Sequence, residues 1–151
     1  MNFTLRALHP ADAPAAAMLH ALAFPDPWSA AVFASWFADP AAITLGYFED
    51  EELVTFVLLS AVLGEADILT LATNPARRNE GLARDLLMAL IETLTTRGMR
   101  RLTLDVAEDN TPARRLYERL GFTLDGRRKG YYAAGRPAPV DALLMSCSLP
   151  V

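Results

Sequence analysis

The residues with the most evident chemistry form a short basic loop between a strand-like run and a long helix pattern. The apolar run at residues 68–72 leads through Thr73 into the sequence Arg-Arg-Asn-Glu-Gly at residues 77–81. A helix N-terminus presents unpaired N–H groups and the positive end of the helix dipole, which together bind anions. Gly81 lets the backbone approach a ligand closely. The pattern therefore predicts a pyrophosphate cradle, formed by Arg78, Asn79, Glu80, Gly81, Leu82, Ala83 and Arg84.

Each chemical candidate also has a structural alternative. The basic loop equally suits a solvated helix start with surface arginines. Asp105, near the end of the alternating run 101–106, is either a base or an acid that pairs with an arginine. Tyr117 lies on an apolar helical stripe, where the pattern alone favours a core tyrosine, and Asn110 is an N-cap, a ligand contact or both. No cluster of metal ligands is visible, so no metal is expected. Three residues are expected to be incidental: His9, His20 and Cys147.

The elements that must position these residues make an α/β domain. Hydrophobic periodicity predicts the order β-α-α-β-β-β-α-β-α-β-β, a mixed sheet of about six to seven strands flanked by four helices. Strands are expected at residues 3–8, 43–48, 53–60, 66–73, 101–106, 122–124, 128–132 and 142–148. Helices are expected at residues 13–23, 29–38, 82–98 and 110–121, with Ser29 as an N-cap, Pro112 in a first turn and glycines at two C-terminal ends. The strand–helix–strand–helix part at residues 66–122 predicts locally parallel pairing.

The composition bounds the class of protein. The chain has 151 residues, of which 52% are hydrophobic and 21% charged, as expected for one globular domain at residues 1–151. The net charge of −4 argues against a nucleic-acid binder, which usually carries a basic stripe. The longest near-apolar run, residues 53–64, is too short to span a bilayer, and no signal peptide is apparent. With a single cysteine, these features favour a cytoplasmic protein that is a monomer or a weak dimer.

Two stretches together resemble a known family. Residues 78–83, Arg-Asn-Glu-Gly-Leu-Ala, fit the signature Gln/Arg-x-x-Gly-x-Gly/Ala. Residues 110–122, which contain Asn110, Tyr117 and Gly121-Phe122, are similar to a second signature. Both occur in the order and at about the distance found in the GNAT superfamily of acetyl-coenzyme A-dependent N-acetyltransferases. The resemblance covers nearly the whole chain.

Within the superfamily, the chain most resembles the bacterial enzymes that acetylate the N-terminal alanine of a small-subunit ribosomal protein. Residues 24–29, Phe-Pro-Asp-Pro-Trp-Ser, are similar to their Phe-Pro-Trp-Ser loop, with two extra residues. Residues 104–106, Leu-Asp-Val, are similar to their Leu-Glu-Val strand. Residues 127–132 and 141–145 are similar to the ending Arg-x-x-Tyr-Tyr…Asp-Ala-x-x-Met.

The resemblance implies a role for each candidate. The cofactor is expected to pair with Leu71, Ala72 and Thr73 as an added strand, where a bulge opens the sheet, and an N–H near Leu71 or Ala72 would face the thioester oxygen. Asp105 stands where the family has its catalytic glutamate, and Tyr117 is the expected acid for the leaving thiolate. Asn110 would contact the cofactor, and Arg77 its 3′-phosphate. The side chains expected on the peptide side are Trp28, Tyr131, Tyr132 and Asp141.

The expected function is therefore acetyl transfer from acetyl-coenzyme A to a primary amine, with the N-terminal alanine of a ribosomal protein as the first choice. A small amine, such as an amino acid or polyamine, is a second acceptor. The third alternative is a domain that binds acyl-coenzyme A without turnover. Three departures from the family pattern keep the alternatives open: Asp105 is one methylene shorter than glutamate, Glu80 places an acid in the phosphate loop, and Val140 replaces an acid beside Asp141.

Overall fold

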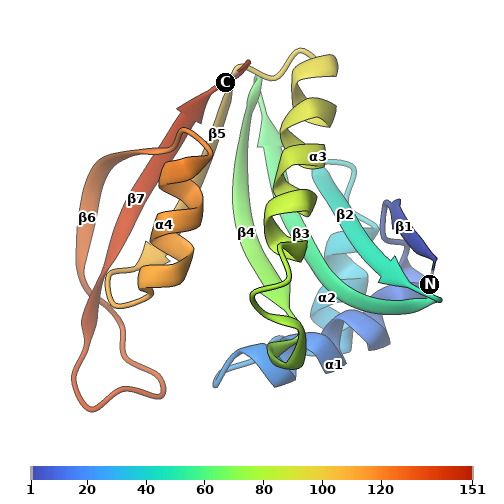
Figure 1. The fold of residues 1–151 in the computed structure, drawn as a ribbon, viewed down its shortest axis with the longest axis horizontal. Helices are drawn as coiled ribbons and strands as arrows, with labels where there is room; N and C mark the ends of the chain where they lie inside the picture. The colour runs from blue at the N-terminus through green and yellow to red at the C-terminus, as the bar shows by residue number, and fades with distance from the viewer. Residues whose placement is uncertain (1, 151) are drawn as a thin grey trace.

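Seven strands form one mixed sheet in the computed structural model, which describes residues 2–150 (Figure 1). Their order across the sheet is β1-β2-β3-β4-β5-β7-β6. The strands are β1 Phe3–Arg6, β2 Ala42–Glu49, β3 Glu52–Val62, β4 Glu65–Thr73, β5 Arg101–Ala107, β6 Thr123–Tyr132 and β7 Val140–Ser148. The helices are α1 Ala13–Ala23, α2 Ala30–Phe37, α3 Leu82–Thr96 and α4 Thr111–Arg119, with short 3-10 turns at Pro10–Asp12 and Pro75–Arg77. The predicted α/β fold, with four helices on a mixed sheet, is confirmed.

The helices begin where the sequence signals them. The Ser29 hydroxyl accepts the Val32 N–H at 3.2 Å at the start of α2. Asn110 does the same for the Ala113 N–H at 3.3 Å at the start of α4. Both are ordinary N-caps, in which a side-chain oxygen satisfies one of the orphan N–H groups of the first turn. Gly81 precedes α3 but has no side chain with which to cap it.

Two predictions about strands are wrong. The strand expected at residues 3–8 ends at Arg6, because the Leu8 N–H bonds to the Thr44 hydroxyl at 2.8 Å and not to a neighbouring backbone. The two short strands expected at 122–124 and 128–132 are one strand, β6, that continues through two irregularities in its register with β7. Bulges of this kind let a strand bend without ending.

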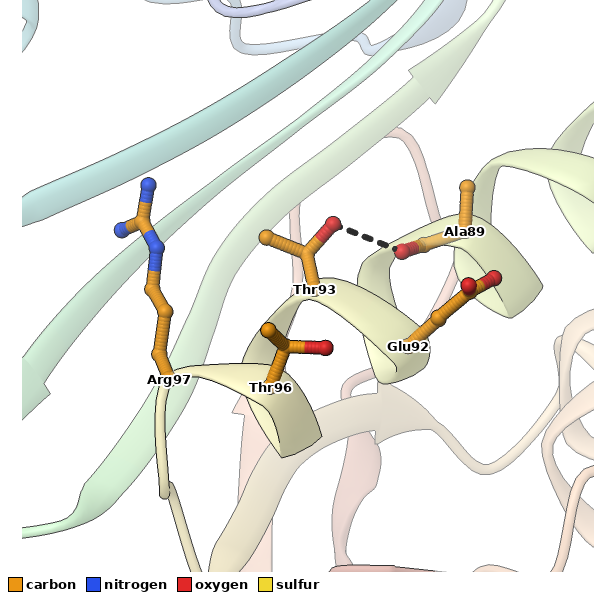
Figure 2. Close-up of a pocket in the computed structure, with 5 residues that line it drawn as sticks. All are labelled: Ala89, Glu92, Thr93, Thr96 and Arg97. Atoms are coloured by element: carbon orange, nitrogen blue, oxygen red, sulfur yellow. Dashed lines mark hydrogen bonds between the residues drawn. The ribbon is translucent and has the colours of Figure 1, made fainter.

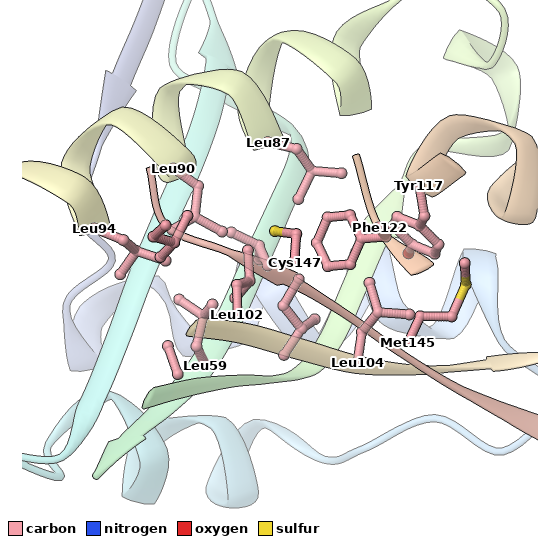
Figure 3. Packing of buried hydrophobic residues seen from close by; sticks show 14 of the residues in the cluster. Leu59, Leu87, Leu90, Leu94, Leu102, Leu104, Tyr117, Phe122, Met145 and Cys147 are labelled. Atoms are coloured by element: carbon pink, nitrogen blue, oxygen red, sulfur yellow. The ribbon is translucent and has the colours of Figure 1, made fainter. Parts of the chain in front are cut away.

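The helices cover the two faces of the sheet as separate layers. Strand β3 is buried on both sides: Val57 and Leu59 face the core beneath α3 and α4, whereas Phe56 and Leu58 face the core beneath α1 and α2. Such alternation is the period-two geometry of a strand. Figure 3 shows the first of these cores, in which leucines of α3 pack against β5 and β7.

The central feature of the sheet is the separation of β4 from β5. These parallel strands pair only from Glu65 to Asp67 on β4 and from Arg101 to Thr103 on β5. Beyond that point β4 pairs only with β3, and β5 only with β7. The register of β3 and β4 skips Leu69, which places a bulge in β4 just after the last shared pair. The parallel pairing predicted for residues 66–122 is therefore confirmed, but over three residue pairs only.

Candidate functional site

The opening between β4 and β5 exposes backbone groups that no strand uses. The Asn74 N–H donates to a β3 carbonyl at 2.9 Å, which directs residue 74 towards β3. Backbone groups alternate in direction along a strand, so Ala72 also faces β3, where its C=O accepts from the Thr55 hydroxyl at 2.9 Å. Leu71 and Thr73 then direct their N–H and C=O groups into the opening. Of the three residues expected to pair with a cofactor, Ala72 is the one whose backbone turns away.

Asp105 and Tyr117 lie on opposite faces of the sheet beside this opening. Alternate residues of β5, from Leu102 to Val106, belong to the core beneath α3 and α4. Asp105 lies between them in sequence and so points to the face that carries α1 and α2. Tyr117 enters the first core from α4 (Figure 3). Two ligands that approach from the two faces would meet between this carboxyl and this phenol.

Tyr117 is buried, with 7% of its surface exposed, and its ring centroid lies 5.6 Å from that of Phe122. Burial raises the pKa of Tyr117 well above that of a free phenol, and the neighbouring Tyr132 adds to the effect. The hydroxyl therefore keeps its proton throughout the neutral range. It can serve as a proton donor, and not as a base.

Asp105 is half-buried, and burial is the main cause that raises the pKa of its carboxyl. The negative charge of Asp67 adds to this, whereas the Arg128 guanidinium acts in the opposite direction. Among residues 2–150, Asp105 forms no ion pair within 4.0 Å. This argues against the alternative of a structural acid paired with an arginine. A raised pKa brings a carboxylate closer to the range in which it accepts protons usefully.

The loop before α3 has the backbone geometry of an anion cradle. Asn79 and Gly81 have φ angles of +68° and +78°, in the left-handed region. The first intrahelical bond of α3 is from the Asp85 N–H to the Gly81 C=O, so the N–H groups before Asp85 have no partner within the helix and no side-chain cap. The Arg84 guanidinium lies close beside the Gly81 Cα, since a Cβ built there would stand 3.3 Å from its Nη2. Arg78 is exposed on the approach.

Glu80 does not compete for this cradle, because Arg77 neutralises it. The Arg77 Nε donates to both carboxylate oxygens of Glu80 at 3.0 Å, and its Nη2 donates to Glu49 at 2.7 Å. Arg77 was expected to reach a 3′-phosphate. The structure instead commits it to two acids, one of them at the end of β2. The loop is thereby tied to the sheet, and the acid within it is paired.

The hairpin between β6 and β7 carries three of the four predicted peptide-side residues. The rings of Tyr131 and Tyr132 meet edge to face at 5.1 Å, and Tyr131 is 54% exposed. The pKa of Tyr132 is raised by burial first and by the charge of Asp105 second. Asp141 instead accepts the Gly130 N–H at 3.0 Å and lies 3.5 Å from the Arg127 guanidinium. Asp141 therefore stabilises the hairpin, and its contact with an acceptor stays a prediction.

His20, predicted to be incidental, is the hub of the loop between α1 and α2. It is 3% exposed, and its ring packs against those of Phe24, Trp28 and Phe33 at centroid distances of 4.4, 5.4 and 5.2 Å. Trp28, a predicted peptide-side residue, is partly buried in this cluster. One sequence signal could have found His20: it lies four residues after the buried Ala16, on the inner stripe of α1.

Other features of the described residues carry none of the predicted chemistry. No group of three His, Cys, Asp or Glu side chains within residues 2–150 could hold a metal ion, and no helix there is long and apolar enough to cross a membrane. Burial raises the pKa of Cys147 to about 11, so the thiol stays protonated. Figure 2 shows an open depression of about 350 Å³ at the C-terminal end of α3, lined by Ala89, Glu92, Thr93, Thr96 and Arg97. It lies at the opposite end of α3 from the anion cradle.

Comparisons with known proteins agree with this geometry. The model of the acetyltransferase (GNAT) family matches residues 13–122, more than half of the chain. The [ribosomal protein bS18]-alanine N-acetyltransferase of Escherichia coli K12 is 34% identical over 145 residues, which cover 95% of each chain. The enzyme of the same name from Haemophilus ducreyi is 36% identical over 107 residues, 71% of this chain and 74% of that one.

Solved structures show the same fold. The crystal structure of the ribosomal-protein-S18-alanine N-acetyltransferase from E. coli superposes with a TM-score of 0.93 at 31% identity, covering 99% of this chain and 96% of that one. Arabidopsis thaliana NAA60 in complex with acetyl-CoA superposes with a TM-score of 0.87 at 22% identity, covering 98% and 99%. With its split β4–β5 pair, its uncapped α3 and these similarities over nearly its full length, the chain belongs to the acetyltransferase (GNAT) family.

Proposed function

We propose that this protein transfers the acetyl group of acetyl-coenzyme A to the N-terminal amino group of a protein, with the N-terminal alanine of ribosomal protein bS18 as its substrate. The acceptor is supported by relatives that align with 95% of the chain and are [ribosomal protein bS18]-alanine N-acetyltransferases. The observation that carries the chemistry is the opening between β4 and β5, with Asp105 on one face and Tyr117 on the other. The proposal places the activity in the cytoplasm, where ribosomal proteins are made.

The residues present fit a coenzyme A pyrophosphate. The free N–H groups at the start of α3 and the guanidinium groups of Arg78 and Arg84 would hold it. The pairing of Glu80 with Arg77 offsets one nearby negative charge, and Asp85, in the first turn of α3, lies 3.3 Å from the Arg84 guanidinium. Leu71 and Thr73 would pair with the amide-bearing arm, as the peptide backbone of an added strand does. Asn110 uses its side-chain oxygen to cap α4, so its amide nitrogen is the group left for a cofactor contact.

When bound, acetyl-coenzyme A supplies a thioester whose carbonyl carbon bonds to the amine nitrogen as the carbon–sulfur bond breaks. The Leu71 N–H would donate to the carbonyl oxygen, where negative charge develops. Tyr117 would give its proton to the departing sulfur. Asp105 would take the proton that the amine loses, through a water because of its short side chain. An N-terminal amine has a pKa of about 7.8, so about a seventh of it is neutral at pH 7 and a weak base suffices.

The test is release of thiol from acetyl-coenzyme A with a peptide that begins with the bS18 N-terminal sequence, followed by mass spectrometry of the product. We expect one acetyl group on the α-amine, and no release with the same peptide blocked at its N-terminus. Turnover with small amines but not with the peptide would contradict the proposed acceptor. Tight binding of acetyl-coenzyme A without turnover of any amine would instead identify a non-catalytic domain.

A further inference from the structure

Both ring nitrogens of the buried His20 are engaged in hydrogen bonds. The Trp28 backbone N–H donates to His20 Nδ1 at 3.0 Å, so Nδ1 carries no hydrogen. His20 Nε2 must then hold the ring hydrogen of the neutral tautomer, and it donates to the Thr70 hydroxyl at 3.0 Å. Burial lowers the pKa of His20, in agreement with a neutral ring. The tautomer is thus determined by its two partners.

These two bonds join parts of the molecule that are distant in sequence. Trp28 belongs to the α1–α2 loop, residues 24–29, whereas Thr70 belongs to β4. Thr70 follows the bulge residue Leu69 and precedes Leu71, whose backbone faces the opening. His20 therefore holds the α1–α2 loop against the strand that forms one edge of the opening.

The same loop contacts the other part of the divided sheet, which consists of β5, β6 and β7. A Cβ built on Gly135 would lie 3.2 Å from both Cβ and Cγ of Pro25, so the Pro25 ring lies directly beside Gly135. Gly135 lies in the β6–β7 hairpin that carries Tyr132. In Figure 1 this hairpin and the α1–α2 connection lie near each other at the lower end of the sheet, where β4 and β5 have parted. The loop thus extends from β4 to the hairpin, on the face to which Asp105 points.

We propose that His20 is a positioning residue for the acceptor: it holds the α1–α2 loop between β4 and the β6–β7 hairpin, and so sets the entrance through which a peptide N-terminus reaches the opening. This inference rests on the proposed function. A loop fixed in advance binds a peptide without a further ordering cost, whereas a released loop must be ordered by each peptide. Removing either bond of His20 should therefore weaken peptide binding and leave the cofactor site intact.

Two amide substitutions, each of which keeps one hydrogen-bonding position of the imidazole ring, separate the two bonds. In His20→Gln the amide group lies near the position of Nε2, so the bond to Thr70 can persist while the bond to Trp28 is lost. In His20→Asn the amide group lies near the position of Nδ1, so the bond to Trp28 persists and the bond to Thr70 is lost. Thr70→Val removes the same second bond from the other side, with little change in volume.

Steady-state kinetics then provides the decisive comparison. We expect each of the three variants to raise KM for the peptide about threefold to tenfold, the usual worth of one or two hydrogen bonds. The values of kcat and of KM for acetyl-coenzyme A should change less than twofold. The double variant His20→Asn/Thr70→Val should have a peptide KM no higher than that of either single variant. Both substitutions remove the same hydrogen bond between His20 and Thr70. Amide hydrogen exchange at Trp28 should accelerate in His20→Gln and stay slow in Thr70→Val.

The opposite results would overturn the inference. Unchanged peptide KM in Thr70→Val and His20→Gln, with Trp28 exchange accelerated in the latter, would show that the loop does not serve the acceptor. A similar decrease in kcat together with increases in KM for both the peptide and acetyl-coenzyme A would show a general structural role. A wild-type enzyme that acetylates no N-terminal peptide would refute the proposed function itself. That failure appears in the wild type, whereas failure of the His20 role appears only in the variants.

Discussion

Asp105 and Tyr117 approach the opening from opposite faces, which gives each a distinct partner. The carboxyl points to the face that carries the α1–α2 loop, where an acceptor amine would arrive. The phenol lies among the side chains under α4, on the face of α3 and the anion cradle, where a departing thiolate would lie. Burial raises both pKa values, which makes the carboxyl a stronger base and keeps the phenol protonated, so that a proton is present for transfer at neutral pH.

Tyr117→Phe tests the acid role, because it removes one hydroxyl and keeps the ring that packs on Phe122. We expect kcat to fall about 10²-fold to 10³-fold, within the usual range for general acid catalysis. Affinity for acetyl-coenzyme A, measured by calorimetry, should change little. Tyr47→Phe, at a ring of β2 that packs against the first core and has no proposed role, is the matched control and should keep kcat near the wild-type value. An unchanged kcat in Tyr117→Phe would remove this residue from the chemistry.

Asp105→Asn tests the base through its pH dependence. Below the pKa of the α-amine, most of the acceptor carries a proton that a base must remove, whereas at pH 9 most of it is already neutral. We therefore expect the loss of kcat/KM for the peptide to be larger at pH 6.5 than at pH 9. Rates measured across this range with one peptide make the comparison. A loss of the same size at every pH would assign Asp105 a structural role.

At the scale of elements, the loop before α3 depends on backbone conformation at Gly81. In Gly81→Ala the left-handed φ costs about 1 kcal/mol, and the new methyl group also meets the Arg84 guanidinium. Gly98→Ala is a matched control, since Gly98 has the same φ of +78° with nothing within 4 Å of its Cβ position. We expect both variants to lose similar stability in urea, but only Gly81→Ala to bind acetyl-coenzyme A more weakly. Equal affinity in both would exclude a cradle at Gly81.

The ion pairs of Arg77 connect the same loop to β2 and permit a rescue experiment. Arg77→Met leaves the Glu80 carboxylate unpaired beside the phosphate site, so we expect affinity for acetyl-coenzyme A to fall about threefold to tenfold at low salt. Adding Glu80→Gln should restore most of the affinity. Arg101→Met, which breaks pairs with Glu65 and Asp125, is the control and should have no effect on binding. If the double variant binds acetyl-coenzyme A as weakly as Arg77→Met does, then Arg77 acts through its ion pair with Glu49 or by contacting the cofactor itself.

At the scale of the whole molecule, two cores lie on either side of one sheet that is split in its middle. The shared β4–β5 pairs hold the arms together at one end, and the contact between Pro25 and Gly135 joins them at the other. His20 lies in the second core and holds Phe24 and Trp28, which lie on either side of Pro25 in the α1–α2 loop. The stability of this core therefore depends on the neutral state of a histidine.

The pH dependence of the free energy of unfolding should reveal the protonation of His20. In the unfolded chain His20 binds a proton below pH about 6.5, whereas in the folded protein burial lowers its pKa. The unfolded state then binds more protons near and below this pH, so the free energy of unfolding decreases as the pH falls through this range. The raised pKa of Asp105 has the opposite effect on the pH dependence of stability, but this effect is the same in the wild type and in His20→Gln. Urea unfolding at pH 7.5 and 5.5 should show a smaller loss for His20→Gln than for the wild type; parallel losses would contradict the prediction.

The local sequence was sufficient for the family and the helix starts, and it singled out the loop before α3 as the candidate anion cradle, which stays a prediction. Caps such as Ser29 and Asn110, and a glycine before an amphipathic run, act through hydrogen bonds and backbone angles within a few residues, so they can be read from the chain. Asp105 and Tyr117 were nominated by the resemblance of their motifs to those of the family, because the pattern alone favoured a core tyrosine at position 117.

What only the tertiary structure decided depends on contacts between distant residues. The bulge at Leu69 turns Leu71 to the opening and Ala72 away from it, Glu49 shares Arg77 with Glu80, and Asp141 is used within its hairpin. The role of His20 was missed because its partners lie 8 and 50 residues away, and a lone histidine in a helix carries no sign of them. The loop of residues 77–84 was apparent from sequence because its physics is local, whereas the acceptor entrance emerges only when the two arms of the sheet come together.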